Sequence, residues 1–287
     1  MTAKLAQIDG LTRFSLTTAD AKRAAQFYEA AFGCRAIAAD RLAGPDFERL
    51  MDVTGGAERI TLKLGREIME LVQFDVPGAP YPRPWSSSDL VFQHLAIVVA
   101  DMPRAFQRLS TVDGWMPISR GGPQRLPASS GGVTAFKFRD PEGHPLELLA
   151  FPEGGSNWPA VPSNEVCLGV DHSAIGVSDS SASIAFYEKI GLTVTGRSFN
   201  HGSAQERLDD VPDAAVEVTA LTPRRPVPHL ELLCYRTPRR RLATVRKAND
   251  IASTHLIFAI SRAVNAADRT SAVRSIRDPD GHAFLIA

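Results

Sequence analysis

The chain has 287 residues, of which 44% are apolar and 22% are charged, values that fit a globular protein of two ordinary domains and exclude an intrinsically disordered chain. Lysine and arginine together number 32, and so do aspartate and glutamate, so the net charge is zero. That balance argues against a nucleic-acid or anionic-membrane partner, because both favour a basic excess.

Cysteine content and hydropathy bear on the compartment. Cys34, Cys167 and Cys234 are far apart and odd in number, which argues against a disulfide framework and favours a reducing environment. No apolar segment approaches the roughly 18 residues of a membrane span, and residues 1–9 lack the apolar centre of a signal peptide. We therefore expect a cytoplasmic protein with no membrane partner.

In chain order, the residue pattern predicts a strand, a helix and three strands, and then the same order again. Residues 11–18 are predicted to form the first strand, and a helix is expected to begin at Asp20 and end at Gly33. The three strands that follow are expected at 34–39, 59–64 and 68–74. Further copies of this order are expected at 93–151, 170–235 and 255–286. The fourth copy is shortened, because Asp278 lies 23 positions after His255, whereas Asp140 lies 46 positions after His94.

The two halves of the chain also repeat residue by residue. The matching segments are Phe27-Tyr28-Glu29 with Phe186-Tyr187-Glu188, Phe47-Glu48-Arg49-Leu50 with Gln205-Glu206-Arg207-Leu208, Glu70 with Glu231, His94 with His255, and the turn from Asp140 to His144 with the turn from Asp278 to His282. A duplication that retains histidine and glutamate at equivalent places indicates a duplicated fold with a site built from those side chains.

This pattern resembles the vicinal oxygen chelate superfamily, which includes glyoxalase I, the extradiol dioxygenases and the fosfomycin and bleomycin resistance proteins. The resemblance is carried by the strand-start residues His94 and His172, the Phe-Tyr-Glu helices and the Asp-Pro-x-Gly-His turns. It implies an α+β fold of four βαβββ modules, the fourth truncated, that pair into two curled, mixed β-sheet cups. It also implies a metal inside a cup, bound by first-strand and last-strand residues. The first-strand positions here are Arg13, His94, His172 and His255, and the last-strand positions are Glu70, Glu147, Glu231 and Leu285.

Strand geometry favours the same site. Ser15, Ala96 and Ala174 lie at even spacing from the strand-start residues, so these small side chains share their face and leave room on it. A glutamate within an apolar strand is costly to bury unless it is paired or metal-bound. Two imidazoles and a carboxylate suit Fe, Mn, Ni or Zn. The alternative is structural: Glu70 would pair with Arg13, and the strand-start histidines would only make hydrogen bonds, as we expect for His144 and His282 in their turns.

Two pairings of the modules are compatible with the sequence. In-order pairing, which we favour, gives one domain at 1–152 and a second at 166–287, and its metal ligands would be His172, Glu231 and His255. Nested pairing would instead join modules two and three and gather His94, Glu147, His172 and Glu231. His172 and Glu231 belong to the site under either pairing.

The function expected from the resemblance is a metal-dependent enzyme that chelates a small oxygen-bearing substrate, acting as a glyoxalase-like lyase or isomerase or as a dioxygenase. Glu231 and Glu147 are the candidate catalytic carboxylates, and Arg13 and Glu70 are assigned to substrate binding. The alternative is a metal-free protein that sequesters a small molecule. The short fourth module is predicted to expose a sheet edge, which favours a homodimer.

Overall fold

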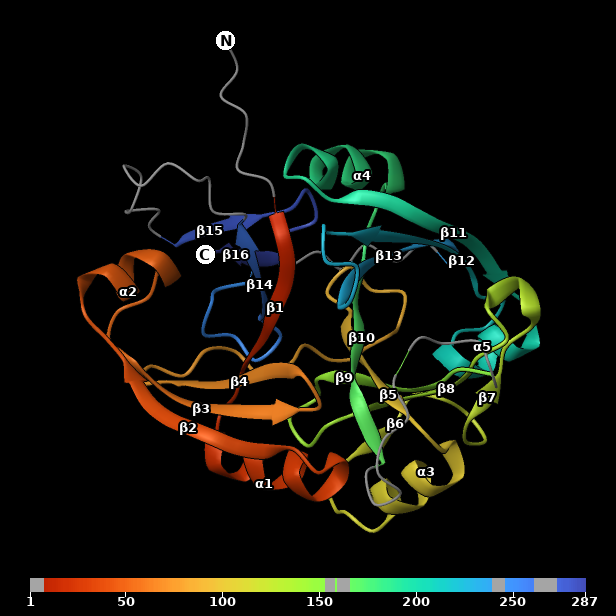
Figure 1. Cartoon of the computed structure of the whole chain (residues 1–287), viewed down its shortest axis with the longest axis horizontal. Coiled ribbons are helices and arrows are strands. Elements are labelled where there is room, and N and C mark those ends of the chain that lie inside the picture. The colour runs from red at the N-terminus through yellow and green to blue at the C-terminus, as the bar shows by residue number, and fades with distance from the viewer. Residues whose placement is uncertain (1–7, 153–157, 159–165, 239–245, 261–272) are drawn as a thin grey trace.

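The computed structural model describes residues 8–152, 158, 166–238, 246–260 and 273–287. They form two curved mixed sheets that lie side by side, which we call the terminal sheet and the central sheet (Figure 1). The terminal sheet has the order β15-β16-β14-β1-β4-β3-β2, and the central sheet has the order β11-β12-β13-β10-β5-β9-β8-β6, with β7 beside β8. This is the α+β arrangement of paired modules that the sequence predicts.

The strands of the terminal sheet are β1 (Ile8–Thr17), β2 (Arg35–Leu42), β3 (Ala57–Leu64), β4 (Glu67–Phe74), β14 (Thr254–Ile260), β15 (Arg274–Arg277) and β16 (Ala283–Ile286). Those of the central sheet are β5 (Gln93–Val99), β6 (Met116–Pro117), β7 (Gln124–Arg125), β8 (Thr134–Arg139), β9 (Pro145–Ala150), β10 (Cys167–Gly176), β11 (Thr193–His201), β12 (Ala215–Thr222) and β13 (His229–Thr237). The helices are α1 (Ala21–Phe32), α2 (Pro45–Met51), α3 (Met102–Ser110), α4 (Ser180–Lys189), α5 (Ser203–Asp209) and the 3-10 turn η1 (Ala128–Ser130). No helix in these ranges is long and apolar enough to cross a membrane.

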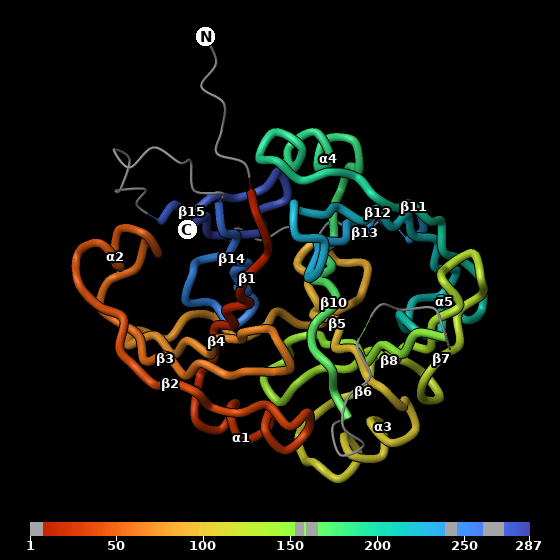
Figure 2. The backbone as a smooth tube through the Cα atoms, in the orientation of Figure 1, coloured from red at the N-terminus to blue at the C-terminus, as the bar shows by residue number. Residues whose placement is uncertain are grey.

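The modules pair in the nested order, so the in-order pairing that the sequence analysis favoured is wrong. β1 runs antiparallel to β14, and β5 runs antiparallel to β10. The first and last modules therefore share the terminal sheet, as the adjacent red and blue strands in Figure 2 show. The four first strands occupy equivalent places in the repeat, so the residue pattern does not decide between the two pairings. The ranges 1–152 and 166–287 remain the two halves of the repeat, and each sheet takes one module from each half.

Capping residues fix the longer helices at the predicted places. The carboxylate of Asp20 accepts the backbone N–H groups of Lys22 and Arg23, which satisfies donors that the first turn of α1 leaves unpaired. Asp101 and Asp179 cap α3 and α4 in the same way. The helix α1 ends at Gly33, whose φ of 75° is in the left-handed region that glycine adopts easily. The predicted bounds of this helix are confirmed.

One large core joins both sheets to the longer helices. It contains apolar side chains from both sheets, such as Met69 and Leu71 of β4 and Leu146 and Leu148 of β9. The opposite face of each sheet carries the concave surface where the sequence analysis places its candidate ligands. We call these surfaces the terminal cup and the central cup.

The histidines in the two Asp-Pro-x-Gly-His turns are structural, as predicted. Nδ1 of His144 lies 2.8 Å from Oδ2 of Asp140, and Nε2 lies 2.9 Å from the carbonyl oxygen of Thr17 in β1. His282 makes the equivalent contact of 2.8 Å with the carbonyl oxygen of Gly176 in β10. Each turn therefore ties its own module to the end of the preceding module's first strand.

Candidate functional site

The central cup brings together four candidate ligands from four adjacent strands. His94 lies on β5, Glu147 on β9, His172 on β10 and Glu231 on β13. The strand register alternates these large side chains with alanines. Ala96 lies beside both His172 and Glu147, and Ala174 lies beside both His94 and Glu231. The small side chains leave space between the four polar groups, as the even spacing in the sequence predicts.

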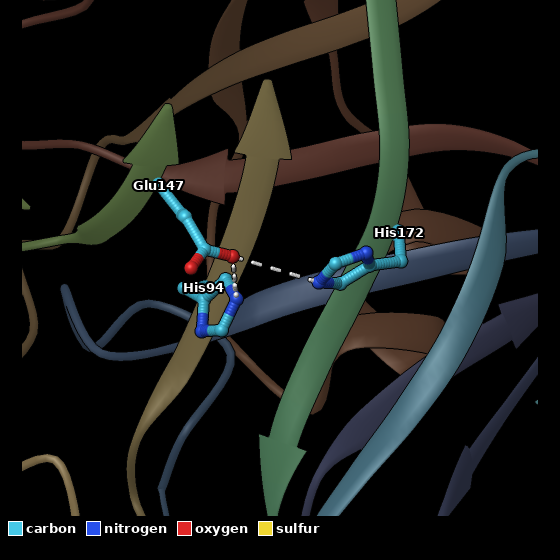
Figure 3. Close-up of side chains that lie close together, drawn as sticks. All are labelled: His94, Glu147 and His172. Atoms are coloured by element: carbon cyan, nitrogen blue, oxygen red, sulfur yellow. Dashed lines mark hydrogen bonds and ion pairs between the residues drawn. The ribbon is translucent and has the colours of Figure 1, made fainter. Parts of the chain in front are cut away.

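The four side chains converge on one another within hydrogen-bonding and ion-pairing range. Nε2 of His94 lies 3.1 Å from Oε2 of Glu147, and Nε2 of His172 lies 3.7 Å from the same oxygen (Figure 3). Nε2 of His172 is also 3.4 Å from Oε2 of Glu231. One ligand atom each from His94, Glu147 and His172 lies within 4.8 Å of the others, a spacing that a single ion can bridge.

Two further residues support this cluster from β10 and β13. Oδ2 of Asp171 lies 2.9 Å from Nδ1 of His172, so the carboxylate fixes that ring with Nε2 directed at the two glutamates. Nε2 of His229 lies 3.6 Å from Oε1 of Glu231. A carboxylate that holds the second nitrogen of a histidine is the usual support of a histidine ligand to a metal.

Burial and mutual pairing set the charges in the cluster. Burial lowers the pKa of His94 and favours its neutral form. Burial also opposes the charge of His172, but Glu231 and Asp171 outweigh it and raise the pKa of His172 to about 9. For Glu231 burial acts to raise the pKa, and the neighbouring His172 and His229 instead lower it to about 2. Without an ion, both glutamates of the cluster are therefore ionised, and of its two histidines His172 is the protonated one.

The cluster lies on the wall of a cavity of about 380 Å³, a size suited to a small organic molecule. Apolar side chains from three strands, among them Leu149, Val218 and Leu233, form much of the lining. The remaining polar lining includes the exposed Ser129, the half-buried Ser198 and Asn200, and the buried Lys137. The arrangement combines an apolar enclosure with a few convergent polar groups, as ligand-binding sites do.

Comparison with known proteins agrees with this architecture. A family model described as Glyoxalase/Bleomycin resistance protein/Dioxygenase superfamily matches residues 10–148. Glyoxalase I from Zea mays has a similar structure, with a TM-score of 0.58 and 16% sequence identity over 96% of this chain and 91% of that one. The first part of the chain, residues 10–148, is thus similar to this superfamily in sequence. A candidate dioxygenase from Bacillus subtilis subsp. subtilis str. 168 is also similar, with a TM-score of 0.58 and 14% identity over 98% of this chain and 86% of that one. No curated protein matches the chain in sequence.

At these identities the similarity to the solved structures shows the fold alone, so whether this protein can hold a metal has to be judged from its own residues. Nδ1 of His94 is buried and has no hydrogen-bond partner within the described ranges. The polar contact of this ring is therefore the one with Glu147, and His94 is held by the cluster rather than by the scaffold. That observation disfavours the structural interpretation of this strand-start histidine. Two histidines and two glutamates, one histidine braced by Asp171, form a donor set that fits a divalent transition metal.

The terminal cup does not repeat this site. Its four equivalent positions hold Arg13, Glu70, His255 and Leu285. Glu70 is paired with Arg13 at 3.2 Å and with Arg59 at 3.1 Å, so the structural pairing that the sequence left open is present. Apolar side chains from α2 and the sheet, including Phe47, Phe74 and Leu285, pack together over this face. The grouping of His172, Glu231 and His255 that followed from in-order pairing is not formed, because His255 lies in the other sheet.

Sequence reasoning missed several residues of the central cup. Asp171 precedes His172, and His229 lies two positions before Glu231 on the same face of β13, so both carried a local signal that was available. The short helices α2 and α5 were also missed, although the repeated segments Phe47–Leu50 and Gln205–Leu208 marked them. Lys137 and Asp209 gave no local signal, since their meeting depends on how α5 packs beside β8.

Proposed function

We propose that this protein is a metal-dependent enzyme of the superfamily that binds one divalent ion in the central cup and acts on a small oxygen-bearing molecule. The supporting observation is the convergence of His94, Glu147, His172 and Glu231 on the wall of one cavity. The terminal cup keeps only a histidine and an arginine-paired glutamate at these positions and lacks the cluster within the described ranges. The site residues are therefore specific to one of two otherwise similar faces.

A bound ion would supply Lewis acidity to two vicinal oxygens of the substrate. The two glutamates differ in what they can do beside it. Glu147 is 7% exposed and hydrogen-bonded to His94, which suits a fixed ligand. Glu231 is 22% exposed, and its second oxygen faces His229, so this ionised carboxylate is the one of the two that a substrate proton can reach. We assign Glu147 to ligation and Glu231 to ligation or general base catalysis, in a reaction of the lyase, isomerase or dioxygenase class.

Metal analysis of protein purified without a metal-binding tag tests this function. We expect about one equivalent of Fe, Mn, Ni or Zn per chain, as purified or after reconstitution. Glu231→Gln and His94→Ala should lose most of it. The duplication provides matched controls, because Glu70→Gln and His255→Ala change the equivalent residues of the terminal cup and should leave the metal content unchanged.

Absence of metal in the wild-type protein after reconstitution would contradict the proposal. The same protein would then be a metal-free binder whose cavity sequesters a small molecule. Equal loss of metal in Glu70→Gln and Glu231→Gln, with both proteins folded, would contradict the assignment of the ion to the central cup.

A further inference from the structure

A buried ammonium group lies in the same cavity as the ligand cluster. Nζ of Lys137 lies 2.7 Å from Oδ1 of Asp209 at the end of α5. The other oxygen of Asp209 accepts hydrogen bonds of 2.6 Å from Nε2 of Gln205 and of 2.6 Å from the hydroxyl of Tyr235. The Asp209 carboxylate thus accepts hydrogen bonds from three donors, and it holds the ammonium group of Lys137 in a fixed position.

The position of Lys137 relative to the ligands follows from the strand register. Lys137 on β8 is the cross-strand partner of Glu147 on β9, so their side chains emerge from neighbouring backbone positions onto one face. Lys137, Gln205 and Tyr235 all line the cavity. An ammonium group has three donors, and Asp209 is the one acceptor of Nζ within the described ranges. Among the described residues, two donor positions of Lys137 therefore have no acceptor, and they lie beside the ligand cluster.

The terminal cup shows what these positions become where the ligand cluster is lacking. The repeat aligns Gln205 with Phe47, Asp209 with Met51, Tyr235 with Phe74 and Lys137 with Ser275. The polar network is replaced there by an apolar contact, in which the rings of Phe47 and Phe74 stack with centroids 5.9 Å apart. The fold thus packs this region without a buried charge. A buried ion pair is generally no more stabilising than apolar packing, so the network in the central cup is not explained by stability.

We propose that Lys137 is the substrate-binding cation of the central cup and that it holds an anionic oxygen, such as a carboxylate, of a substrate whose neighbouring oxygens face His94, Glu147, His172 and Glu231. Asp209, Tyr235 and Gln205 are positioning residues that keep Nζ directed into the cavity. The substrate class is then a small 2-oxo or 2-hydroxy acid with an apolar remainder that fits against Leu149 and Val218. The role of Lys137 in the reaction rests on the function proposed above, whereas its preference for an anion does not require a metal.

Two probes of nearly equal shape test this role by calorimetric titration. Benzoylformate carries two vicinal oxygens and a carboxylate charge, and 1-phenyl-1,2-propanedione replaces that charged oxygen with a methyl group. Each is titrated into the wild-type protein with Co²⁺ and, separately, with a chelator. The visible absorption of Co²⁺ reports independently whether the ion is bound. We expect benzoylformate to bind at least about tenfold more tightly than the dione, the effect of one charge-assisted hydrogen bond.

Removal of the lysine should abolish that preference. Lys137→Met leaves Asp209 buried without its cation and is expected to destabilise the fold. The decisive variant is therefore Lys137→Met/Asp209→Met, which removes both charges. Its methionine at position 209 matches Met51, the equivalent residue of the terminal cup. The double variant should bind benzoylformate and the dione with affinities within about threefold of each other. Lys137→Arg keeps a cation and should retain part of the preference for benzoylformate.

The outcomes separate the two proposals. Failure of Co²⁺ to bind, with the anion preference intact under chelator, contradicts the metal-dependent function and leaves the role of Lys137 standing. Equal binding of both probes by the wild type, absence of benzoylformate binding, or a preference that survives in the double variant overturns the role of Lys137 whether or not Co²⁺ is bound.

Discussion

Replacement of the buried His255 by asparagine should change how the stability of this protein depends on pH. Burial, and then the cations Arg277 and Arg246, lower the pKa of His255 to about 4 in the folded protein. In the unfolded chain the same ring titrates near its ordinary value of about 6.5. The unfolded state therefore binds a proton at a higher pH than the folded state does. The contribution of His255 to stability is complete above pH 6.5 and is lost as the pH falls toward 4.

The size of the effect follows from that difference in pKa. Between pH 7 and pH 4.5, a group with these two pKa values loses about 2.5 kcal/mol of its contribution to the free energy of unfolding. Asparagine does not titrate, so His255→Asn should lose about 2.5 kcal/mol less than the wild type over this interval. The depressed carboxylates, such as Glu147 and Asp140, begin to lose their own contributions at the lower end of this interval, but they do so in both proteins and cancel in the comparison. His282, which burial keeps neutral, contributes equally to both proteins and cancels in the comparison.

Urea unfolding of the metal-free protein at several pH values between 4.5 and 7 provides the assay. The exposed His201→Asn is the matched control, because it makes the same substitution at a surface position. Parallel profiles for the wild type and His255→Asn would refute the reasoning, since they would mean that His255 binds its proton equally well in both states.

Three further changes test separate parts of the structure. Phe47→Ala, which removes a ring stacked on Phe74 in the terminal cup, should lower the free energy of unfolding by about 3 kcal/mol without changing the metal content, and a loss of metal would show that the cups are not independent. Asp171→Asn should weaken metal binding about 10- to 100-fold in competition with a chromophoric chelator, and an unchanged affinity would show that Asp171 does not orient His172. Tyr28→Phe should destabilise the protein to urea by about 1–2 kcal/mol, because the hydroxyl gives a buried 3.0 Å hydrogen bond to Asp140; a clearly different loss for Tyr187→Phe, whose bond to Asp278 is also 3.0 Å, would argue against the equivalence of the repeats.

The sequence predicts the modules because each depends on local features. Asp20 and Gly33 bound a helix through capping and left-handed geometry, and the period of two in the strands separates the core face from the cup face. The pairing of modules depends instead on which first strands meet across long stretches of chain. β1 and β5 present similar alternating patterns to their partners, so no residue marks β14 or β10 as the correct choice. Because the predicted pairing was wrong, His255 was assigned to a metal site to which it does not belong.

The parts of the site that depend on residue type and on position within a strand could be predicted from the sequence. His94, Glu147, His172 and Glu231 were all named from the sequence, and the structure gathers them because β5 lies beside β10. Lys137 could not be found in this way. Its place in the cavity depends on Asp209, which is 72 positions away in the sequence and comes from a short helix that packs against β8.

The nested pairing also determines which of the two sheets can be completed first while the chain is being synthesised. Ile8 of β1 pairs with Ile260 of β14, so this pairing cannot form until synthesis has passed β14, some 250 residues after β1. The strands that carry the ligand cluster all lie between Gln93 and Thr237, and they can assemble earlier. Until Thr254–Ile260 emerges, β1 keeps an open edge that other chains can pair with. Closure of the terminal sheet therefore depends on a strand that is synthesised after all the strands of the central cup, and the open edge of β1 favours aggregation until that strand is made.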